Sequence, residues 1–169
     1  CGLLTPDAGK GYCLGYNLRT ESREIKTHVG YMPQYFSLYR KLTVRENLEF
    51  IAEMYSLTQR KMRIDNVIEQ TGLTDKQSVL AGRLSGGWKQ RLSFAACLLR
   101  NPLLLLLDEP TASIDPKSRS DFWELIKNIA NEGTTILLSS HNMEEMQRCD
   151  RLAFMSEGKI LMHGTLQEM

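Results

Sequence analysis

The sequence has 169 residues, of which 42% are apolar and 24% charged, the size and composition of one globular domain. Its formal net charge is +1, with both signs interspersed, which argues against a nucleic-acid-binding surface. The longest apolar run covers residues 103–107, far short of the roughly 20 residues that span a membrane. The four cysteines are scattered without metal-ligand spacing, which favours reduced thiols and a cytoplasmic protein. The chain begins with Cys1 instead of Met, so we expect it to be part of a longer protein.

The first two thirds of the chain predict two short strands followed by three helices. The strands cover residues 11–18 and 28–33, and Pro33 closes the second. The first helix covers residues 43–55, with Thr43 as its cap and Glu46 completing a capping box. A second helix, residues 60–71, ends at Gly72, and a third, residues 88–99, is entered through a Ser-Gly-Gly turn.

The last third of the chain changes to an alternation of strands and helices. Apolar runs at residues 103–107 and 134–139 are typical of strands that are buried on both faces of a parallel sheet. Between them, residues 116–131 predict a crossover helix with proline at its first position. Residues 151–155 and 159–162 predict a hairpin that turns at 156–158. The order of these elements indicates an α/β fold.

Two carboxylates, Asp108 and Glu109, directly follow the apolar run at 103–107. The carboxyl ends of parallel strands form the edge of an α/β sheet at which ligands bind. In nucleotide hydrolases of this class the first carboxylate holds Mg²⁺ and the second polarises the attacking water. Taken alone, the pair is equally compatible with an acidic turn after a core strand.

The turn Leu84-Ser85-Gly86-Gly87 precedes a predicted helix. It offers an anion a hydroxyl, unobstructed glycine amides and the positive end of a helix dipole. Taken alone, the turn is more typical of an ordinary helix start than of a phosphate site.

Five motifs in a fixed order carry a stronger signal than any one of them. Gln34 follows a predicted strand, Leu84-Ser-Gly-Gly is followed by Lys89-Gln-Arg, Asp108-Glu109 is followed by Pro110, Ser113-Ile-Asp115 comes next, and His141 follows another strand. This succession resembles the ABC ATPase family, in which these motifs are the Q-loop, the signature, Walker B, the D-loop and the switch histidine.

The resemblance implies a P-loop NTPase fold, with a RecA-like parallel sheet core and an inserted α-helical subdomain. In this sequence the helical subdomain with the signature would cover about residues 35–100, and about residues 101–169 would form the carboxyl-terminal part of the core. The strand and helix of the phosphate-binding loop would be missing from the amino end. ATP and Mg²⁺ are the implied ligands.

The resemblance also implies roles for individual residues. Gln34 would contact Mg²⁺ and the attacking water and relay the nucleotide state to transmembrane partners. Asp108 would hold Mg²⁺, Glu109 would be the catalytic carboxylate, and His141 would contact the γ-phosphate. Asp115 would shape the interface between two ATPase domains, or simply start the helix at Pro116.

The signature residues imply a dimer, because in the family the signature closes over ATP that is held mainly by the opposite subunit. Ser85, Gly86 and Gly87 would therefore act across an interface, in a homodimer or between tandem domains. The expected function is that of an ATP-hydrolysing transporter subunit, similar to multidrug and antibiotic exporters. It would work with a transmembrane permease, peripherally at the cytoplasmic face of the inner membrane, and would not bind nucleic acid.

Two departures from the family pattern keep alternatives open. The sequence contains no G-x-x-x-x-G-K-[ST] loop. Ala8-Gly-Lys-Gly11 does not replace it, because Leu4 stands at the place of the first Gly and Gly11 at the place of the Ser or Thr. We therefore expect this chain by itself to be inactive and the full-length protein to be active. The alternatives are a soluble ABC ATPase without a transport role and a non-catalytic domain that donates only its signature. The second departure is Trp88, where the family usually has Gln, from which we expect an altered hydrolysis rate without loss of fold.

Overall fold

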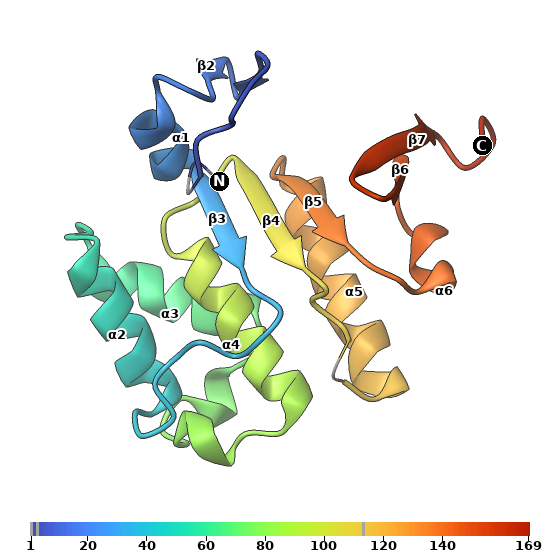
Figure 1. Cartoon of the computed structure of the whole chain (residues 1–169). Helices are drawn as coiled ribbons and strands as arrows, with labels where there is room; N and C mark the ends of the chain where they lie inside the picture. The colour runs from blue at the N-terminus through green and yellow to red at the C-terminus, as the bar shows by residue number, and fades with distance from the viewer. Residues whose placement is uncertain (1, 3, 113) are drawn as a thin grey trace. The chain divides into compact units, whose positions relative to one another are not determined.

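The computed structural model describes residues 2, 4–112 and 114–169, so Cys1 and the D-loop residue Ser113 lie outside the described residues (Figure 1). The chain forms two compact units, residues 1–139 and residues 140–169. The predicted division at about residue 100, between a helical subdomain and the rest of the core, stays a prediction. No helix in the described part of the chain is long and apolar enough to cross a membrane.

A three-stranded parallel sheet lies at the centre of the first unit, in the order β3 (Val29–Met32), β4 (Leu104–Asp108), β5 (Thr135–Ser139). The chain passes from β3 to β4 through helices α2–α4 and from β4 to β5 through helix α5, as the α/β pattern predicts (Figure 1). In this register Leu105 pairs with Gly30 on one side and with Ile136 on the other.

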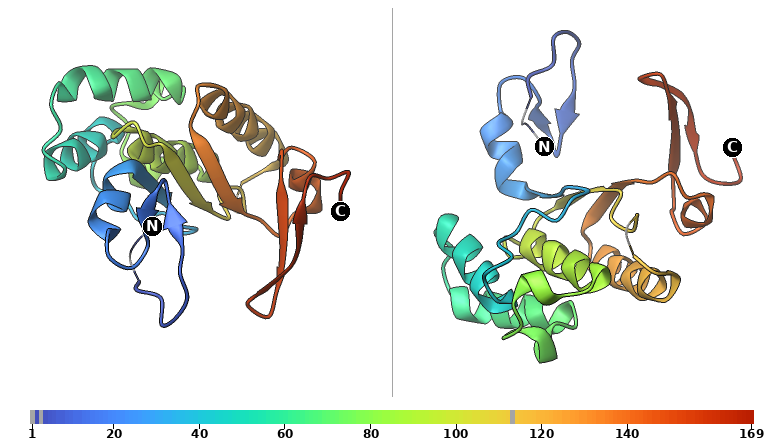
Figure 2. Two further views of the ribbon diagram at one scale, coloured as in Figure 1. Left: turned by 90° about the horizontal axis from the view of Figure 1, so that it is seen from above. Right: turned by 60° about the horizontal axis from the view of Figure 1, so that its bottom comes forward.

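The helices α4 (Gly86–Leu98) and α5 (Pro116–Asn131) cover the same face of this sheet (Figure 2). They pack on each other through Phe94 and Phe122, both fully buried, with ring centroids 5.4 Å apart in a T-shaped arrangement. A Cβ on Gly30 would lie 3.0 Å from the Cys97 carbonyl oxygen, so glycine allows α4 to approach β3 closely.

The prediction that strands 103–107 and 134–139 are buried on both faces is wrong. On the face under α4 and α5, Leu105 and Leu107 are fully or almost fully buried, but on the other face Leu137 is 63% exposed. The reason is that both crossover helices lie on one side of the sheet. In addition, β5 pairs only with β4 among the described residues.

The three predicted helices are confirmed as α2 (Val44–Met54), α3 (Arg60–Gln70) and α4. Two short 3₁₀ turns, Thr74–Lys76 and Ala81–Arg83, lie between α3 and α4. The capping box of α2 is complete. The Thr43 hydroxyl accepts from the Glu46 amide at 3.2 Å, and the Glu46 carboxylate accepts from the Thr43 amide at 2.7 Å.

The single strand predicted at residues 11–18 is wrong, because a tight turn divides it into β1 (Tyr12–Cys13) and β2 (Tyr16–Asn17). The two turn residues, Leu14 and Gly15, have φ values of 53° and 84°, as the two-residue turn of a hairpin requires. Helix α1 (Ser22–His28), which follows, was not predicted, since its seven residues bury only Ile25.

The second unit consists of the short helix α6 (Met143–Met146) and the antiparallel hairpin β6 (Leu152–Ser156), β7 (Lys159–Gly164). The predicted hairpin is confirmed, and it turns through Glu157 and Gly158, both at positive φ. The sequence did not predict α6.

Candidate functional site

The carboxylate pair lies at the carboxyl edge of the parallel sheet, where Asp108 ends β4 and pairs with Ser139 at the end of β5. The Ser139 hydroxyl donates to Asp108 Oδ1 at 2.7 Å and accepts from the Glu109 amide at 3.0 Å. One hydroxyl thus holds both acidic residues in place. Sequence reasoning missed Ser139, whose role follows from strand register and not from any local motif.

Gln34 and Glu109, 75 residues apart in the sequence, meet at this edge. Gln34 Nε2 donates to Glu109 Oε2 at 3.0 Å, from the loop that follows β3. Glu109 has a φ of 42°, in the left-handed region that favours glycine, which turns the chain sharply away from the strand. Three of the predicted site residues, Gln34, Asp108 and Glu109, therefore share one cluster with Ser139.

The signature forms the amino end of α4. Ser85 is the residue before the helix, Gly86 and Gly87 are its first two residues, and the Ser85 hydroxyl caps none of the described amides. Ser85 and Gly86 are exposed. A Cβ on Gly87 would lie 2.9 Å from Ser118 Cβ, so the second glycine is required where α4 meets the start of α5. The amides at this helix end are therefore accessible to an anion.

Asp115 is the cap of α5, and its side chain accepts from the Ser118 amide at 3.0 Å. This hydrogen bond lowers the pKa of Asp115 below its ordinary value. The helix-start interpretation of Asp115 is therefore confirmed, while its part in an interface between ATPase domains stays a prediction. Its exposed position leaves the side chain accessible to a partner.

His141 belongs to the second unit, where it is exposed and lies directly before the cap of α6. The Ser140 hydroxyl donates to Glu145 Oε2 at 2.6 Å and accepts from the Asn142 amide at 3.0 Å. Glu145 is buried, so these contacts fix the backbone on both sides of His141. The pairing of His141 with Glu109 and with a γ-phosphate stays a prediction.

Trp88, the unusual residue of the signature, is half-buried at the first turn of α4. The Lys76 ammonium lies 5.8 Å and the Arg91 guanidinium 5.4 Å from the ring centroid, within the range of cation–π attraction. Arg91 also donates to the Thr71 carbonyl at 3.0 Å. Trp88 therefore links the signature helix to the end of α3 and the turn that follows it.

The donor atoms at the sheet edge fit Mg²⁺. This ion prefers oxygen ligands and is commonly bound by only one or two carboxylates, with substrate phosphates and water completing the octahedron. Asp108 and Gln34, which meet Glu109 and Ser139 at this edge, carry such oxygens. The described residues contain no group of three or more His, Cys, Asp or Glu side chains that could hold a metal by itself.

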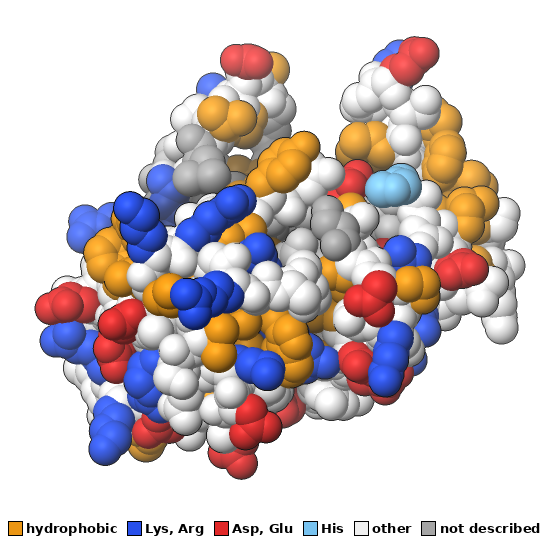
Figure 3. All heavy atoms as spheres, turned by 90° about the horizontal axis from the view of Figure 1, so that it is seen from below, with side chains coloured by type: hydrophobic (Ala, Val, Ile, Leu, Met, Phe, Trp, Pro, Cys, Tyr) orange, Lys and Arg blue, Asp and Glu red, His pale blue; other side chains and the backbone are white. Residues whose placement is uncertain are grey.

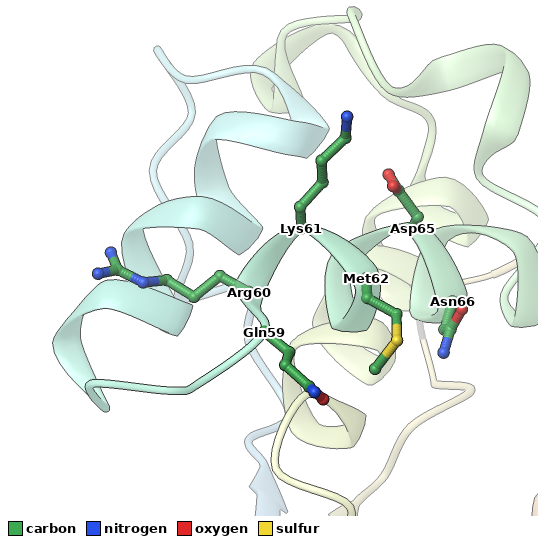
Figure 4. A pocket seen from close by; sticks show the side chains of 6 residues that line it. All are labelled: Gln59, Arg60, Lys61, Met62, Asp65 and Asn66. Carbon is green, nitrogen blue, oxygen red and sulfur yellow. The ribbon is translucent and has the colours of Figure 1, made fainter.

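A separate hollow of about 690 Å³ lies at the amino end of α3 (Figure 4). Six residues line it: Gln59, Arg60, Lys61, Met62, Asp65 and Asn66. Arg60 and Lys61 point away from each other, and the polar groups do not converge on one point (Figure 4). The hollow lacks the convergent polar groups of a substrate site. On the face drawn in Figure 3, basic and acidic side chains are mixed, with no extended area of one sign.

A parallel α/β sheet with two carboxylates and a glutamine at its carboxyl edge, and glycines at the start of an adjoining helix, is typical of the P-loop NTPase fold class. The sequence profile described as "ABC transporter" matches residues 1–112. The chain therefore belongs to the ABC transporter family, and the resemblance noted in the sequence is confirmed.

Curated relatives carry names of transporter ATP-binding proteins. The chain is 39% identical over its whole length to the probable multidrug ABC transporter ATP-binding protein YbhF of Escherichia coli K12, of which it covers 30%. It is 37% identical over 99% of its length to the linearmycin resistance ATP-binding protein LnrL of Bacillus subtilis 168, covering 55%. The chain thus spans between about a third and about half of these relatives.

Solved structures confirm the fold class. The structure of cbiO1 from Clostridium perfringens, described as part of the ABC transporter complex cbiONQ, superposes with a TM-score of 0.88 at 26% identity, covering 99% of this chain and 70% of that one. A dimeric ATP-binding cassette in a post-hydrolysis state, bound to ADP and Pi, superposes with a TM-score of 0.84 at 24% identity, covering 98% and 76%.

Proposed function

We propose that the protein containing this chain is the ATP-binding and ATP-hydrolysing subunit of an ABC transporter. The observation that carries the proposal is the hydrogen bond of 3.0 Å between Gln34 Nε2 and Glu109 Oε2, next to Asp108 at the carboxyl edge of the sheet. Membership of the family does not by itself require this hydrogen bond. A catalytic carboxylate does need a partner that orients it, and Gln34 is such a partner for Glu109.

In this proposal the sheet edge holds the hydrolytic groups of one subunit. Asp108 and Gln34 would hold Mg²⁺, which would neutralise phosphate charge, and Glu109 would accept a proton from the attacking water. Ser139 keeps both carboxylates oriented. His141 is the further group that contacts the γ-phosphate. Because the 169 residues contain no phosphate-binding loop motif, the proposal assigns that loop to another part of the protein.

The exposed signature favours action across a dimer. Ser85 and Gly86 present accessible amides at the start of α4, and Asp115 is exposed at the start of α5. The solved relative in the post-hydrolysis state is itself described as a dimer. We propose that two such domains, in a homodimer or in tandem, close on ATP through these two helix starts.

An apolar hollow formed by residues that follow Gln34 in the sequence supports a permease partner. Tyr39 and Phe50 stack edge to face, with ring centroids 4.9 Å apart, and both are about half exposed, at 55% and 43%. They line a hollow of about 340 Å³ together with residues 40–42. We propose that a transmembrane permease docks here, peripherally to the membrane on its cytoplasmic side, because an exposed aromatic hollow is typical of protein contacts.

The names of the relatives favour export as the direction of transport. They include proteins named for multidrug transport, for linearmycin resistance and for Nod factor export. These are properties of those proteins. For this chain, export of an antibiotic-like or similar small molecule is the proposal that they support.

The test compares ATP hydrolysis by the 169-residue chain, by the full-length gene product, and by the full-length product with Glu109→Gln. We expect turnover only in the full-length protein and its loss in Glu109→Gln, while the control Asp121→Asn, at an exposed position of α5, keeps the parental rate. A full-length protein that binds its permease but never hydrolyses ATP would favour the non-catalytic, signature-donating role instead.

A further inference from the structure

Two segments far apart in the sequence are joined by backbone hydrogen bonds ahead of the signature. The amides of Ala81 and Gly82 donate to the carbonyls of Leu42 and Arg40, both at 2.8 Å. The amides of Val44 and Arg45 donate in turn to the carbonyls of Val79 and Gln77, both at 3.0 Å, and Thr43 pairs with Leu80 in an antiparallel bridge. We call this pairing of residues 40–45 with residues 77–82 the clasp.

Asn47 organises the first half of the clasp. It is 1% exposed, and its amide nitrogen donates to the carbonyls of Tyr39, Leu42 and Thr43 at 3.0, 3.3 and 2.8 Å. Its amide oxygen accepts from the Tyr39 backbone amide at 2.9 Å. A side chain that both donates to carbonyls and accepts from an amide at this place must be a carboxamide. An aspartate at this position would place a carboxylate oxygen, which can only accept hydrogen bonds, against three carbonyl oxygens that also only accept.

Gly82 sets the distance between the two halves. A Cβ at this position would lie 2.9 Å from the Arg40 carbonyl oxygen and 3.3 Å from Arg40 Cβ. The nearest obstacle is backbone, so a methyl group could be accommodated only by moving the two segments apart. Gly82 is exposed, and its backbone is not in the left-handed region, so a side chain here would perturb the spacing and little else.

The clasp connects the loop that follows Gln34 to the segment that leads into the signature residue Ser85, and the proposed reaction needs both. Its first segment begins six residues after Gln34, which contacts Glu109. Its second segment leads through the turn Ala81–Arg83 and the buried Leu84 directly into Ser85. A displacement of one segment is therefore transmitted to the other through the backbone, without any contribution from side chains that touch nucleotide.

We propose that Asn47 and Gly82 are positioning residues for the signature, which hold the loop after Gln34 and the entrance to Ser85 as one unit. This inference rests on the proposed ATPase function. Its consequence is that the arrangement of Gln34 at Glu109 and the arrangement of the signature change together. Changes in the clasp should therefore lower the turnover of a closed dimer more than they weaken nucleotide binding.

The experiment uses the full-length gene product and the variants Asn47→Asp and Gly82→Ala. Gly133→Ala is the control for Gly82→Ala, because it adds a strained methyl group in a turn where no atom lies within 4 Å. Gln70→Glu is the control for Asn47→Asp, because it makes the same amide-to-carboxylate change at an exposed side chain, whose amide donates to Glu132 Oε2 at 2.8 Å. The measurements are urea unfolding, kcat and KM for Mg·ATP, and ATP-dependent dimer formation in a Glu109→Gln background.

We expect kcat to fall about tenfold in each clasp variant, with KM for Mg·ATP within about twofold of the parent and weaker ATP-dependent dimers. The controls should lose stability and keep the parental kcat. Should Asn47→Asp fail to fold, Gly82→Ala carries the test alone. Clasp variants with the kcat of the controls, in an active parent, would overturn the inference. A parent without hydrolysis overturns it as well, but through failure of the proposed function.

Discussion

The hydroxyl of Ser139 offers a direct test of how the carboxylate pair is held. Ser139→Ala removes the bond of 2.7 Å to Asp108 Oδ1 and the bond of 3.0 Å from the Glu109 amide, without filling or emptying a buried space. Glu109 keeps its φ of 42° only while its surroundings hold it there, and Ser139 is one of the groups that do so.

The size of the effect follows from these two bonds. A hydrogen bond to a charged group contributes about 1.5–3 kcal/mol and a neutral one about 0.5–1.5 kcal/mol, so about 4.5 kcal/mol is an upper bound. Ser139 is exposed, and water can replace the hydroxyl at both partners. We therefore expect the free energy of unfolding to fall by only about 1 kcal/mol. Because the two carboxylates are then no longer held in one orientation, kcat/KM should fall by about tenfold, equivalent to about 1.4 kcal/mol of transition-state stabilisation.

The assay measures ATP turnover by the full-length protein as a function of Mg²⁺ concentration, together with urea unfolding. Ser139→Ala should need more Mg²⁺ for half-maximal rate, and Ser139→Thr, which restores a hydroxyl, should recover most of the loss. Ser120→Ala, an exposed serine of α5, is the control. A Ser139→Ala protein with the parental rate and the parental Mg²⁺ dependence would refute the proposed role of Ser139.

Three further changes test other parts of the structure. Trp88→Gln removes two cation–π contacts, so urea unfolding should show a loss of about 1 kcal/mol in the free energy of unfolding. The circular dichroism spectrum should stay that of the parent while the rate of ATP turnover changes, and an unchanged rate would contradict the expectation. Burial raises the pKa of the Cys97 thiol to about 12, and the residue itself is partly exposed, so at pH 8 a thiol reagent should label Cys97 far more slowly in the folded than in the unfolded protein, as mass spectrometry of peptides can check. The Thr43 backbone amide, followed by the Thr43 side chain, lowers the pKa of Glu46. The stability that Glu46→Gln removes should therefore be present at pH 7 and should shrink as the pH falls through the folded-state pKa of Glu46; a loss independent of pH would exclude the carboxylate from the cap.

The sequence was sufficient where the signal is local. The helix of α2 was predicted with its cap because Thr43 and Glu46 lie three residues apart ahead of a regular apolar spacing. The hairpin at residues 11–18 was mistaken for one strand, because Leu14 adopts a positive φ that its residue type does not announce. The burial of the second face of the sheet was also predicted wrongly. An unbroken run of leucines has no alternation that could tell a covered face from an open one.

The residues of the candidate site were likewise predicted only where the signal is local. Gln34, Asp108 and Glu109 were predicted because each stands next to an apolar run and belongs to an ordered set of motifs. Ser139 and Asn47 were not predicted as site residues. The role of Ser139 depends on the register that places it beside Asp108, and the role of Asn47 depends on three carbonyls of a loop that has no regular structure.

The same topology that makes the sheet one-sided also explains why these groups meet. Because β3, β4 and β5 are parallel, the residues that follow or end each strand, Gln34, Glu109 and Ser139, collect at one edge. Both crossovers place their helices on one face, so α4 and α5 begin close together, as the contact of Gly87 with Ser118 requires. A movement of α4 against the sheet would therefore displace the signature and the start of α5 together. The carboxylates, tied to β4 and β5 by backbone and hydroxyl, would stay in place, as the proposed action across two subunits requires.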